Sequence, residues 1–252
     1  MIEHIVRGMY HYCETLAIPA HMENYDDGMC AWIKPKEGAL GPACVYKVNF
    51  GDKPDEEIRE LVQAYREKGA PAAWCVTPLS TQNNIREILF SMGLMDPADA
   101  DMNDQGMAIP PEQMAELRAG TDNSSIAAVR RVGGKEDFKT WCSITNEVLA
   151  GFQMLDSDLY YPLCESGKMV CFLGYAGERP AAASAAINNN GNATLEFIAT
   201  LPDYRKKGMG TAVCRAAINH LINDGAYVIS LRAREMGASL YKSLGFRVYL
   251  DF

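Results

Sequence analysis

The sequence predicts an α+β fold: a mixed, mostly antiparallel sheet flanked by helices and preceded by a smaller domain of related order. Three observations predict it. Short apolar runs joined by tight turns fill the second half, helical periodicity separates some of these runs, and a weaker copy of the same order occupies the first half. The chain has 252 residues, 48% of them hydrophobic, which suffices for one large core or two small ones.

Apolar periodicity and turn residues define the elements of the second half. A strand, a helix and a loop rich in large side chains come first, at 126–132, 135–149 and 152–161. The turn sequences Ala-Gly-Glu-Arg-Pro and Asn-Asn-Asn-Gly-Asn then join three strands into a meander, at 168–175, 181–187 and 193–200. A helix, a strand, a short helix and a last strand follow, at 208–225, 227–231, 236–243 and 246–252.

The first half repeats part of this order in degenerate form. It contains a strand, a helix, a strand and a short helix, at 45–50, 55–68, 72–76 and 84–92. This short helix ends on Ser-Met-Gly-Leu, much as the later one ends on Ser-Leu-Gly-Phe. Two prolines and a run of Gly, Asp, Asn and Ser between the halves indicate a linker. We therefore predict a domain at 1–115, a linker at 116–124 and a second domain at 125–252.

Charge and cysteine content argue against several classes of function. The formal net charge of −8 disfavours a nucleic-acid binder and a protein that docks on anionic membranes. The eight cysteines form no C-x-x-C pair, and the N-terminus lacks an apolar stretch suited to export or to spanning a bilayer. We therefore expect reduced thiols and a cytoplasmic protein. No His/Cys spacing resembles a zinc site, so we expect no metal.

One turn of the second half is suited to an anion. Arg205-Lys-Lys-Gly-Met-Gly210 follows an apolar strand and opens a helix. Free backbone N–H groups, two glycines and three cations at a helix N-terminus favour a phosphate or pyrophosphate. The corresponding segment of the first half, Gly51-Asp-Lys-Pro-Asp-Glu-Glu57, is acidic and would repel such a group. The sequence therefore predicts a single anion site.

Two motifs at fixed spacing make this turn more specific. The first is Ile198-Ala-Thr-Leu-Pro-Asp-Tyr-Arg-Lys-Lys-Gly-Met-Gly210, and the second is Leu240-Tyr-Lys-Ser-Leu-Gly-Phe246. Together they resemble the GCN5-related N-acetyltransferase (GNAT) superfamily and its signatures I-A-V-x-P-x-x-R-x-x-G-x-G and L-Y-x-x-L-G-F, with Thr200 in place of the usual valine. The resemblance covers roughly residues 125–252. It implies a GNAT fold there, and a degenerate GNAT-like first half in a tandem arrangement.

The resemblance implies acetyl-CoA as cosubstrate and no metal. It assigns the pantetheine arm to the strand backbone at Ile198, Ala199 and Thr200, in a slot opened by a bulge and splay of that strand. A strand amide near Ile198 would stabilise the oxyanion of the reaction. The resemblance assigns binding of the pyrophosphate to the turn and the helix start. The implied contacts are Arg205, Lys206, Lys207, Gly208, Met209, Gly210 and Thr211.

Arg234 departs from the family pattern, because many members carry an asparagine at this position. It meets either a coenzyme phosphate or an acidic group of the substrate, and the sequence does not choose between them. A common variant of the motif, S-x-x-G-x-x-L-Y, resembles the run that begins at Arg234.

Two residues match the proton-transfer groups of the superfamily. Glu196 lies two residues before Ile198, so strand alternation predicts that both side chains face the slot. The resemblance makes Glu196 the base that deprotonates the amine, directly or through water. It makes Tyr241 the general acid beside the coenzyme sulfur. The alternatives are an exposed or salt-bridged strand glutamate and a core tyrosine.

The superfamily usually selects its substrate with the first helix pair and the loop between them. In this chain that loop combines acidic and aromatic side chains, which suit a cationic amine. The candidate contacts are Phe152, Asp156 and Tyr160. The alternative is a loop whose aromatic side chains pack on the core.

The sequence thus predicts an N-acetyltransferase that moves an acetyl group from acetyl-CoA to a primary amine of a small molecule or peptide, by direct attack in a ternary complex. We expect a monomer or homodimer with neither nucleic acid nor membrane as a partner. The competing interpretation is a catalytically inactive, acyl-CoA-binding regulatory module. A nucleotide-phosphate loop is disfavoured, because the turn lacks the G-K-[ST] ending of a P-loop.

Overall fold

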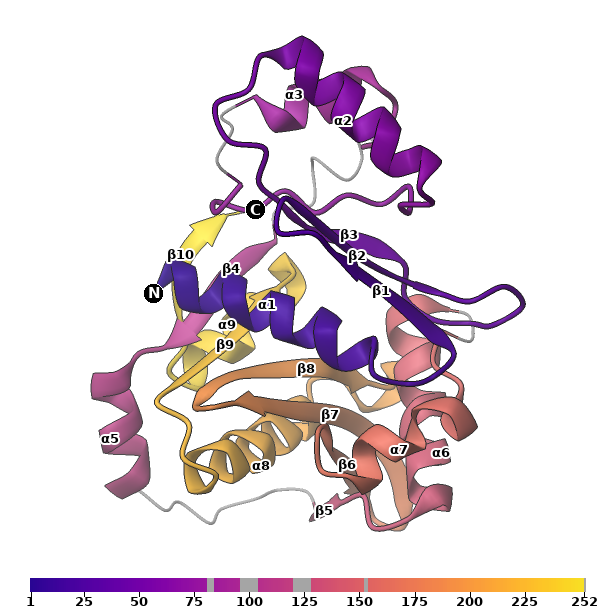
Figure 1. Cartoon of the computed structure of the whole chain (residues 1–252). Coiled ribbons are helices and arrows are strands. Elements are labelled where there is room, and N and C mark those ends of the chain that lie inside the picture. Colours follow the sequence, from indigo (N-terminus) through magenta and orange to yellow (C-terminus); the bar gives the residue numbers. More distant parts are fainter. Residues whose placement is uncertain (81–83, 96–103, 120–127, 152–153, 252) are drawn as a thin grey trace.

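Two sheets of unequal size organise the chain (Figure 1). The computed structural model describes residues 1–80, 84–95, 104–119, 128–151 and 154–251. The larger sheet has seven strands in the order β10-β4-β9-β8-β7-β6-β5, and the smaller sheet has three in the order β1-β2-β3. Neighbouring strands run antiparallel except β8 and β9, which are parallel. The predicted α+β class with a mixed, mostly antiparallel sheet is confirmed.

The first half contributes a long helix, the small sheet and two further helices. These are α1 (Ile2–Leu16), β1 (Met22–Asp26), β2 (Cys30–Pro35), β3 (Cys44–Val48), α2 (Asp55–Glu67) and α3 (Ile85–Ser91). Three acidic residues in the first turn of α2 stabilise the helix by interacting favourably with its dipole. The strand predicted at 72–76 is reduced to a single parallel bridge between Val45 and Trp74. Side chains of β2, β3, α2 and α3 form a core of their own, so this half has its own packed body.

The second half follows the predicted order closely. Its elements are β5 (Ala128–Arg131), α6 (Lys135–Thr145), α7 (Ser157–Glu165), β6 (Val170–Ala176), β7 (Arg179–Asn189), β8 (Asn192–Thr200), α8 (Met209–Asn223), β9 (Val228–Ala233), α9 (Glu235–Ser243) and β10 (Arg247–Asp251). One π-helical turn (Asn146–Ala150) continues α6, and a 3₁₀ turn (Pro202–Tyr204) precedes α8. The loop predicted at 152–161 is corrected in part, because α7 begins within it.

The strand β4 (Gln105–Ile109) joins the two halves. It belongs to the predicted first domain, yet it lies between β10 and β9 in the large sheet. Its last three residues are fully buried, so it lacks the alternation that marks a half-exposed strand. The helix α5 (Pro111–Ala119) follows and runs into the predicted linker. The linker at 116–124 therefore does not separate two sheets, and the domain boundary stays a prediction.

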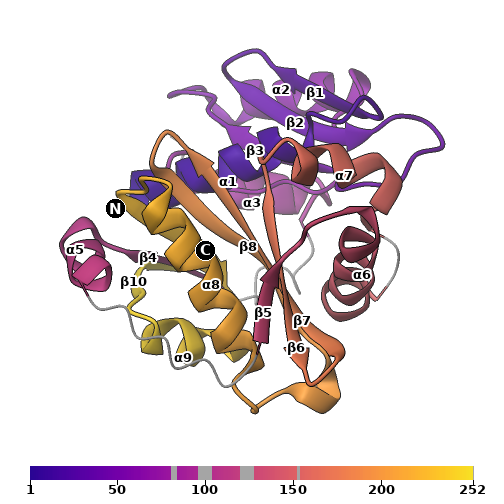
Figure 2. The same cartoon turned by 90° about the horizontal axis from the view of Figure 1, so that it is seen from below.

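Helices cover both faces of the large sheet. Figure 2 shows α8 and α6 on opposite faces. Side chains of α5, α8 and α9 share one core cluster with the sheet, and side chains of α1, α6 and α7 share another. The helix α1 packs on β8 and β9, between the large sheet and the small one. This arrangement places α1 directly over the region where β8 and β9 meet.

Candidate active site

The turn predicted to bind an anion leads into α8. Gly208 precedes the helix with φ of 79°, a left-handed conformation that glycine adopts without strain, and it offers no side chain to cap the helix. The first helical hydrogen bond runs from Ala212 N to Gly208 O (3.0 Å). The N–H groups of 209–211 precede this bond and point out of the helix start. The cationic residues 205–207 are exposed around them. Backbone donors and cations for a phosphate therefore lie together.

Gly210 is a tightly packed position of this turn. A Cβ placed on it would lie 3.1 Å from Leu240 Cδ1 on α9 and 3.3 Å from Thr200 Oγ1 at the end of β8. The missing side chain therefore allows the start of α8 to lie close to β8 and α9. Met209 points its own side chain into the core, with 4% exposed, so its backbone is the part available to a ligand. The backbone of these residues is thus available to an anionic ligand.

The strands β8 and β9 separate after a short paired stretch. Three parallel pairs join residues 192–194 to 228–230, and beyond them the two strands have no ladder pair within 195–200 and 231–233. We call this opening the fork. On its other edge β8 stays paired with β7 as far as Thr200. The edge of β8 that faces the fork is thus open to backbone hydrogen bonds from an extended ligand.

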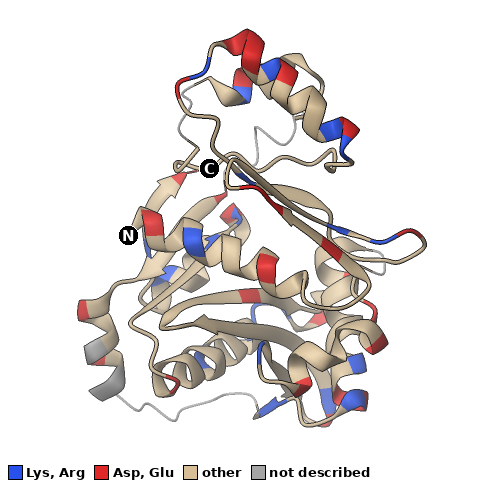
Figure 3. Ribbon diagram, in the orientation of Figure 1, with Lys and Arg blue, Asp and Glu red and all other residues tan. Residues whose placement is uncertain are grey.

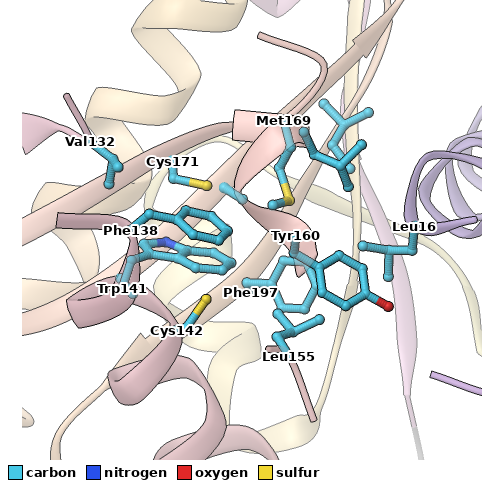
Figure 4. Close-up of a cluster of buried hydrophobic side chains, with 14 of the residues drawn as sticks. Leu16, Val132, Phe138, Trp141, Cys142, Leu155, Tyr160, Met169, Cys171 and Phe197 are labelled. Atoms are coloured by element: carbon cyan, nitrogen blue, oxygen red, sulfur yellow. The ribbon is translucent and has the colours of Figure 1, made fainter. Parts of the chain in front are cut away.

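A β-bulge accompanies the fork. The register between β7 and β8 shifts by one residue between Ala183 and Ala185, and Phe197 in β8 takes φ of 53°. A left-handed conformation costs a non-glycine residue on the order of 1 kcal/mol. Burying a phenylalanine side chain stabilises by about 1.5–3 kcal/mol. Phe197 is 6% exposed and meets Trp141 edge to face, with ring centroids 5.3 Å apart (Figure 4). Packing against α6 therefore holds the bulge in place.

The bulge decides which way the side chains of β8 point. Ile198 packs in the cluster beneath α8, whereas Phe197 packs beneath α6. Glu196 shares a face with Thr194, whose hydroxyl donates to Glu196 Oε1 (2.7 Å), and Thr194 lies under Gly8 of α1. The expectation that Glu196 and Ile198 face the same side is therefore wrong, because the bulge interrupts the alternation.

Glu196 is a half-buried carboxyl on a central strand that carries no other charged residue. It is the one charged residue within 192–200, and Figure 3 shows few charged positions on the central strands. Burial raises its pKa from the ordinary value of 4.5 to about 7, against the opposing effects of the Thr194 hydrogen bond and the Arg232 guanidinium. A carboxyl with this pKa is about half deprotonated at neutral pH and is matched to accept a proton from an ammonium group.

Three residues that the sequence analysis did not select lie around Glu196. Tyr12 on α1 and Arg232 on β9 both interact electrostatically with it. Arg232 Nε in turn contacts Asp104 Oδ2 at 3.2 Å. Arg232 is the charged residue of an otherwise uncharged strand, a signal that could have been used. Tyr12 and Asp104 carried no signal, since they come from distant segments brought in by α1 and β4.

Tyr241 and Arg234 lie at the α9 side of the fork. Tyr241 is 8% exposed and packs against Phe246 with ring centroids 6.0 Å apart. Burial raises the pKa of its hydroxyl, with further contributions from Cys214 and Glu196, so the hydroxyl stays protonated at pH 7. Arg234 precedes α9, is exposed and does not cap the helix with its side chain. The first residue is thus a neutral proton donor near Glu196, and the second is an accessible cation.

Comparison with known proteins agrees with this geometry. A family model described as Acetyltransferase (GNAT) family matches residues 135–246. This part of the chain has the GNAT fold. A GCN5-related N-acetyltransferase from Kribbella flavida superposes with a TM-score of 0.64 at 12% identity, over 97% of this chain and 91% of that one. The GNAT domain and the N-terminal half together therefore share the fold of a single other protein.

Two further solved structures resemble the GNAT domain and its neighbour. A conserved protein of unknown function from Staphylococcus epidermidis gives a TM-score of 0.56 at 9% identity, over 89% of both chains. A GNAT-family protein from Novosphingobium aromaticivorans gives 0.45 at 17% identity, over 60% of this chain and 61% of that one. Comparison with curated proteins gave no match.

The substrate residues predicted for the GNAT domain have packing roles where they are described. The Asp156 carboxylate accepts hydrogen bonds from two amides in the first turn of α7 as its N-cap. Tyr160 is fully buried, donates its hydroxyl to Met22 Sδ (3.2 Å) and lies in the cluster of Figure 4. Phe152 lies outside the described residues. Asp156 and Tyr160 therefore support the fold in this structure and are not part of the fork.

The described residues also bear on metals and membranes as partners. Among the described residues, no group of three or more His, Cys, Asp or Glu side chains is arranged to hold a metal ion. In the same part of the chain, no helix combines the length and apolar character needed to cross a membrane.

Proposed function

We propose that the protein is an N-acetyltransferase that transfers the acetyl group of acetyl-CoA to a primary amine of a small molecule or peptide. The observation that carries this proposal is the fork between β8 and β9. It has an anion-binding turn beyond the end of β8 and, near its base, a carboxyl whose pKa is about 7. The match of residues 135–246 to the GNAT family supports the same conclusion.

The coenzyme would lie along the fork. The open edge of β8 at 198–200 would pair with the amides of the pantetheine arm, in the manner of an added strand. The turn at 205–210 and the amide of Thr211 would hold the pyrophosphate, and Gly210 allows this helix start to lie close to the end of β8. Arg234 is accessible to a phosphate or to an acidic group of the acceptor.

The reaction needs proton transfers at the amine and at the thiolate. Glu196 would take a proton from the ammonium of the acceptor, and the neutral amine would attack the thioester carbon. A C–N bond forms, a strand amide near Ile198 stabilises the oxyanion, and the C–S bond then breaks. Tyr241 would give its proton to the departing thiolate and regain one from the nitrogen of the new amide, and Glu196 would release its proton to solvent. The products are an amide and free coenzyme A, and from the sequence we keep the expectations of a cytoplasmic monomer or homodimer.

Two measurements test this function together. A thermal-shift titration with acetyl-CoA should raise the Tm, whereas an equal concentration of ATP should not. Release of the coenzyme thiol should then occur with at least one member of a panel of primary amines. Replacing Glu196 by glutamine should abolish thiol release and keep the Tm shift. No Tm shift with acetyl-CoA would contradict the coenzyme site, and a shift without turnover over the whole panel would identify an inactive acyl-CoA-binding module.

A further inference from the structure

We propose that Arg232, held in place by Asp104, is a positioning residue that keeps Glu196 available as the base of the reaction. The inference rests on the proposed function, because it concerns how the same carboxyl is prepared for proton transfer. It is carried by the strand register, by the contact with α1 and by the buried partner of the arginine.

The register brings Glu196 and Arg232 to the base of the fork. The last parallel pair is Thr194 with Ser230, and each of the two charged residues lies two positions further along its strand. The strand β9 is regular here, since its pairing with β4 is continuous, so Arg232 shares a face with Ser230. Glu196 shares the corresponding face with Thr194 through their hydrogen bond. The carboxyl and the guanidinium therefore emerge side by side where the strands begin to separate.

The helix α1 covers this pair. A Cβ placed on Gly8 would lie 2.6 Å from Ser230 Oγ and 3.6 Å from the Cβ of Thr194, so α1 passes closely over the last paired residues. Tyr12 follows one helical turn later, about 6 Å along the axis. Two strand residues advance by about the same distance. Tyr12 therefore lies over the charged pair, in agreement with its electrostatic interaction with both members.

Asp104 holds the arginine through its Nε atom. It immediately precedes β4, and its carboxylate contacts Arg232 Nε at 3.2 Å. The Asp104 side chain is 8% exposed, whereas the Arg232 side chain is 44% exposed. A buried carboxylate that holds Nε limits how far the guanidinium can turn into solvent. The guanidinium also interacts with the Cys75 thiol and with the Glu196 carboxyl.

The arginine opposes the effect of burial on Glu196. The groups that interact with this carboxyl come from four elements: Thr194 on β8, Arg232 on β9, Tyr12 on α1 and Tyr241 on α9. Both tyrosines have raised pKa values and are neutral at pH 7, so Arg232 is the cation of this set. Removing it should raise the pKa of Glu196 further above 7, because an opposite charge nearby favours the carboxylate.

The pH dependence of kcat/KM tests this role. For Arg232→Met we expect the acid limb to move up by about one pH unit, with kcat/KM about fivefold lower at pH 7 and close to wild type at pH 9. Arg232→Lys keeps the charge and should keep the limb near its wild-type position. Arg247→Met removes an equal charge from the exposed pair with Glu112 and should leave the profile unchanged. The double variant Asp104→Asn/Arg232→Met avoids leaving a buried carboxylate unpaired, and it replaces the single variant if that one does not fold.

A direct titration separates this inference from the proposed function. The ¹³C signal of the Glu196 carboxyl, assigned with Glu196→Gln, should titrate near pH 7 in the wild type and at higher pH without Arg232. An unchanged carboxyl titration in the Arg232 variants would overturn the inference. So would a loss of activity that is equal at every pH, since that result would make Arg232 a substrate contact. If no amine is acetylated by the wild type, the proposed function fails, while the carboxyl titration still decides the role of Arg232.

Discussion

Replacing Thr194 by valine removes the hydroxyl that donates to Glu196 Oε1 at 2.7 Å and changes the shape of the side chain little. Thr194 is 2% exposed, so water is poorly placed to substitute for the lost donor. A hydrogen bond to a charged group contributes about 1.5–3 kcal/mol, and about 1.4 kcal/mol corresponds to a tenfold change in an ionisation constant. Since this bond lowers the pKa of Glu196, its loss should move the value from about 7 to roughly 8.

The assay is the pH profile of kcat/KM for thiol release. The deprotonated fraction of Glu196 at pH 7 falls from about one half to about one tenth when the pKa rises by one unit. We therefore expect kcat/KM to fall roughly fivefold at pH 7 and to recover by pH 9. Thr140→Val, which removes a hydroxyl that donates to Glu136 O in an exposed hydrogen bond on α6, is the matched control and should not move the profile. A Thr194→Val profile that superimposes on the wild type would refute the assignment of Glu196 as the base.

Two further predictions concern stability. The folded-state pKa of Glu196 lies above its ordinary value, so the stabilisation by the neutral form is complete below pH 4.5 and is lost as the pH rises through about 7. Glu196→Gln should therefore raise the free energy of unfolding by about 1–3 kcal/mol at pH 8.5 and by much less at pH 5. Denaturant titrations at the two pH values measure this difference. Equal effects at both would contradict a raised pKa of the Glu196 carboxyl in the folded state. Asp156→Ala should lower the free energy of unfolding by about 1 kcal/mol through loss of the α7 cap and leave KM for the amine unchanged. A raised KM with unchanged stability would return Asp156 to the substrate site.

The elements of the second half were predictable because local signals mark them. Glycine at 208 marks the start of α8, and the Asn-Gly turn marks the start of β8. The bulge at Phe197 was not readable in this way, because it depends on the contact with Trp141 on α6. Strand alternation then gave the wrong face for Glu196 relative to Ile198. The strand β4 was missed because three consecutive buried residues show no period.

In the candidate site too, the features that depend on local sequence were predictable and those that depend on distant contacts were not. The anion-binding turn is local in sequence, and its structure agrees with the expected helix start. Tyr12, Asp104 and Arg232 meet Glu196 only through the packing of α1 and β4, so the sequence did not bring them together. Asp156 was read as a substrate contact although an aspartate just before a helix is a common N-cap. The structure shows the capping role, and a substrate contact at Asp156 stays a prediction.

Calorimetric titration with acetyl-CoA tests the central claim, that the turn before α8 holds the pyrophosphate of an acyl-CoA. Gly210→Glu and Gly210→Gln both place a long side chain between Leu240 and Thr200, and they differ in charge alone. One carboxylate near one phosphate charge costs about 1 kcal/mol in water and about 4 kcal/mol near a protein surface at 4 Å. We expect the wild type to bind and the glutamate variant to bind at least about tenfold more weakly than the glutamine variant. Equal affinities for the two variants, or no binding by the wild type, would contradict it.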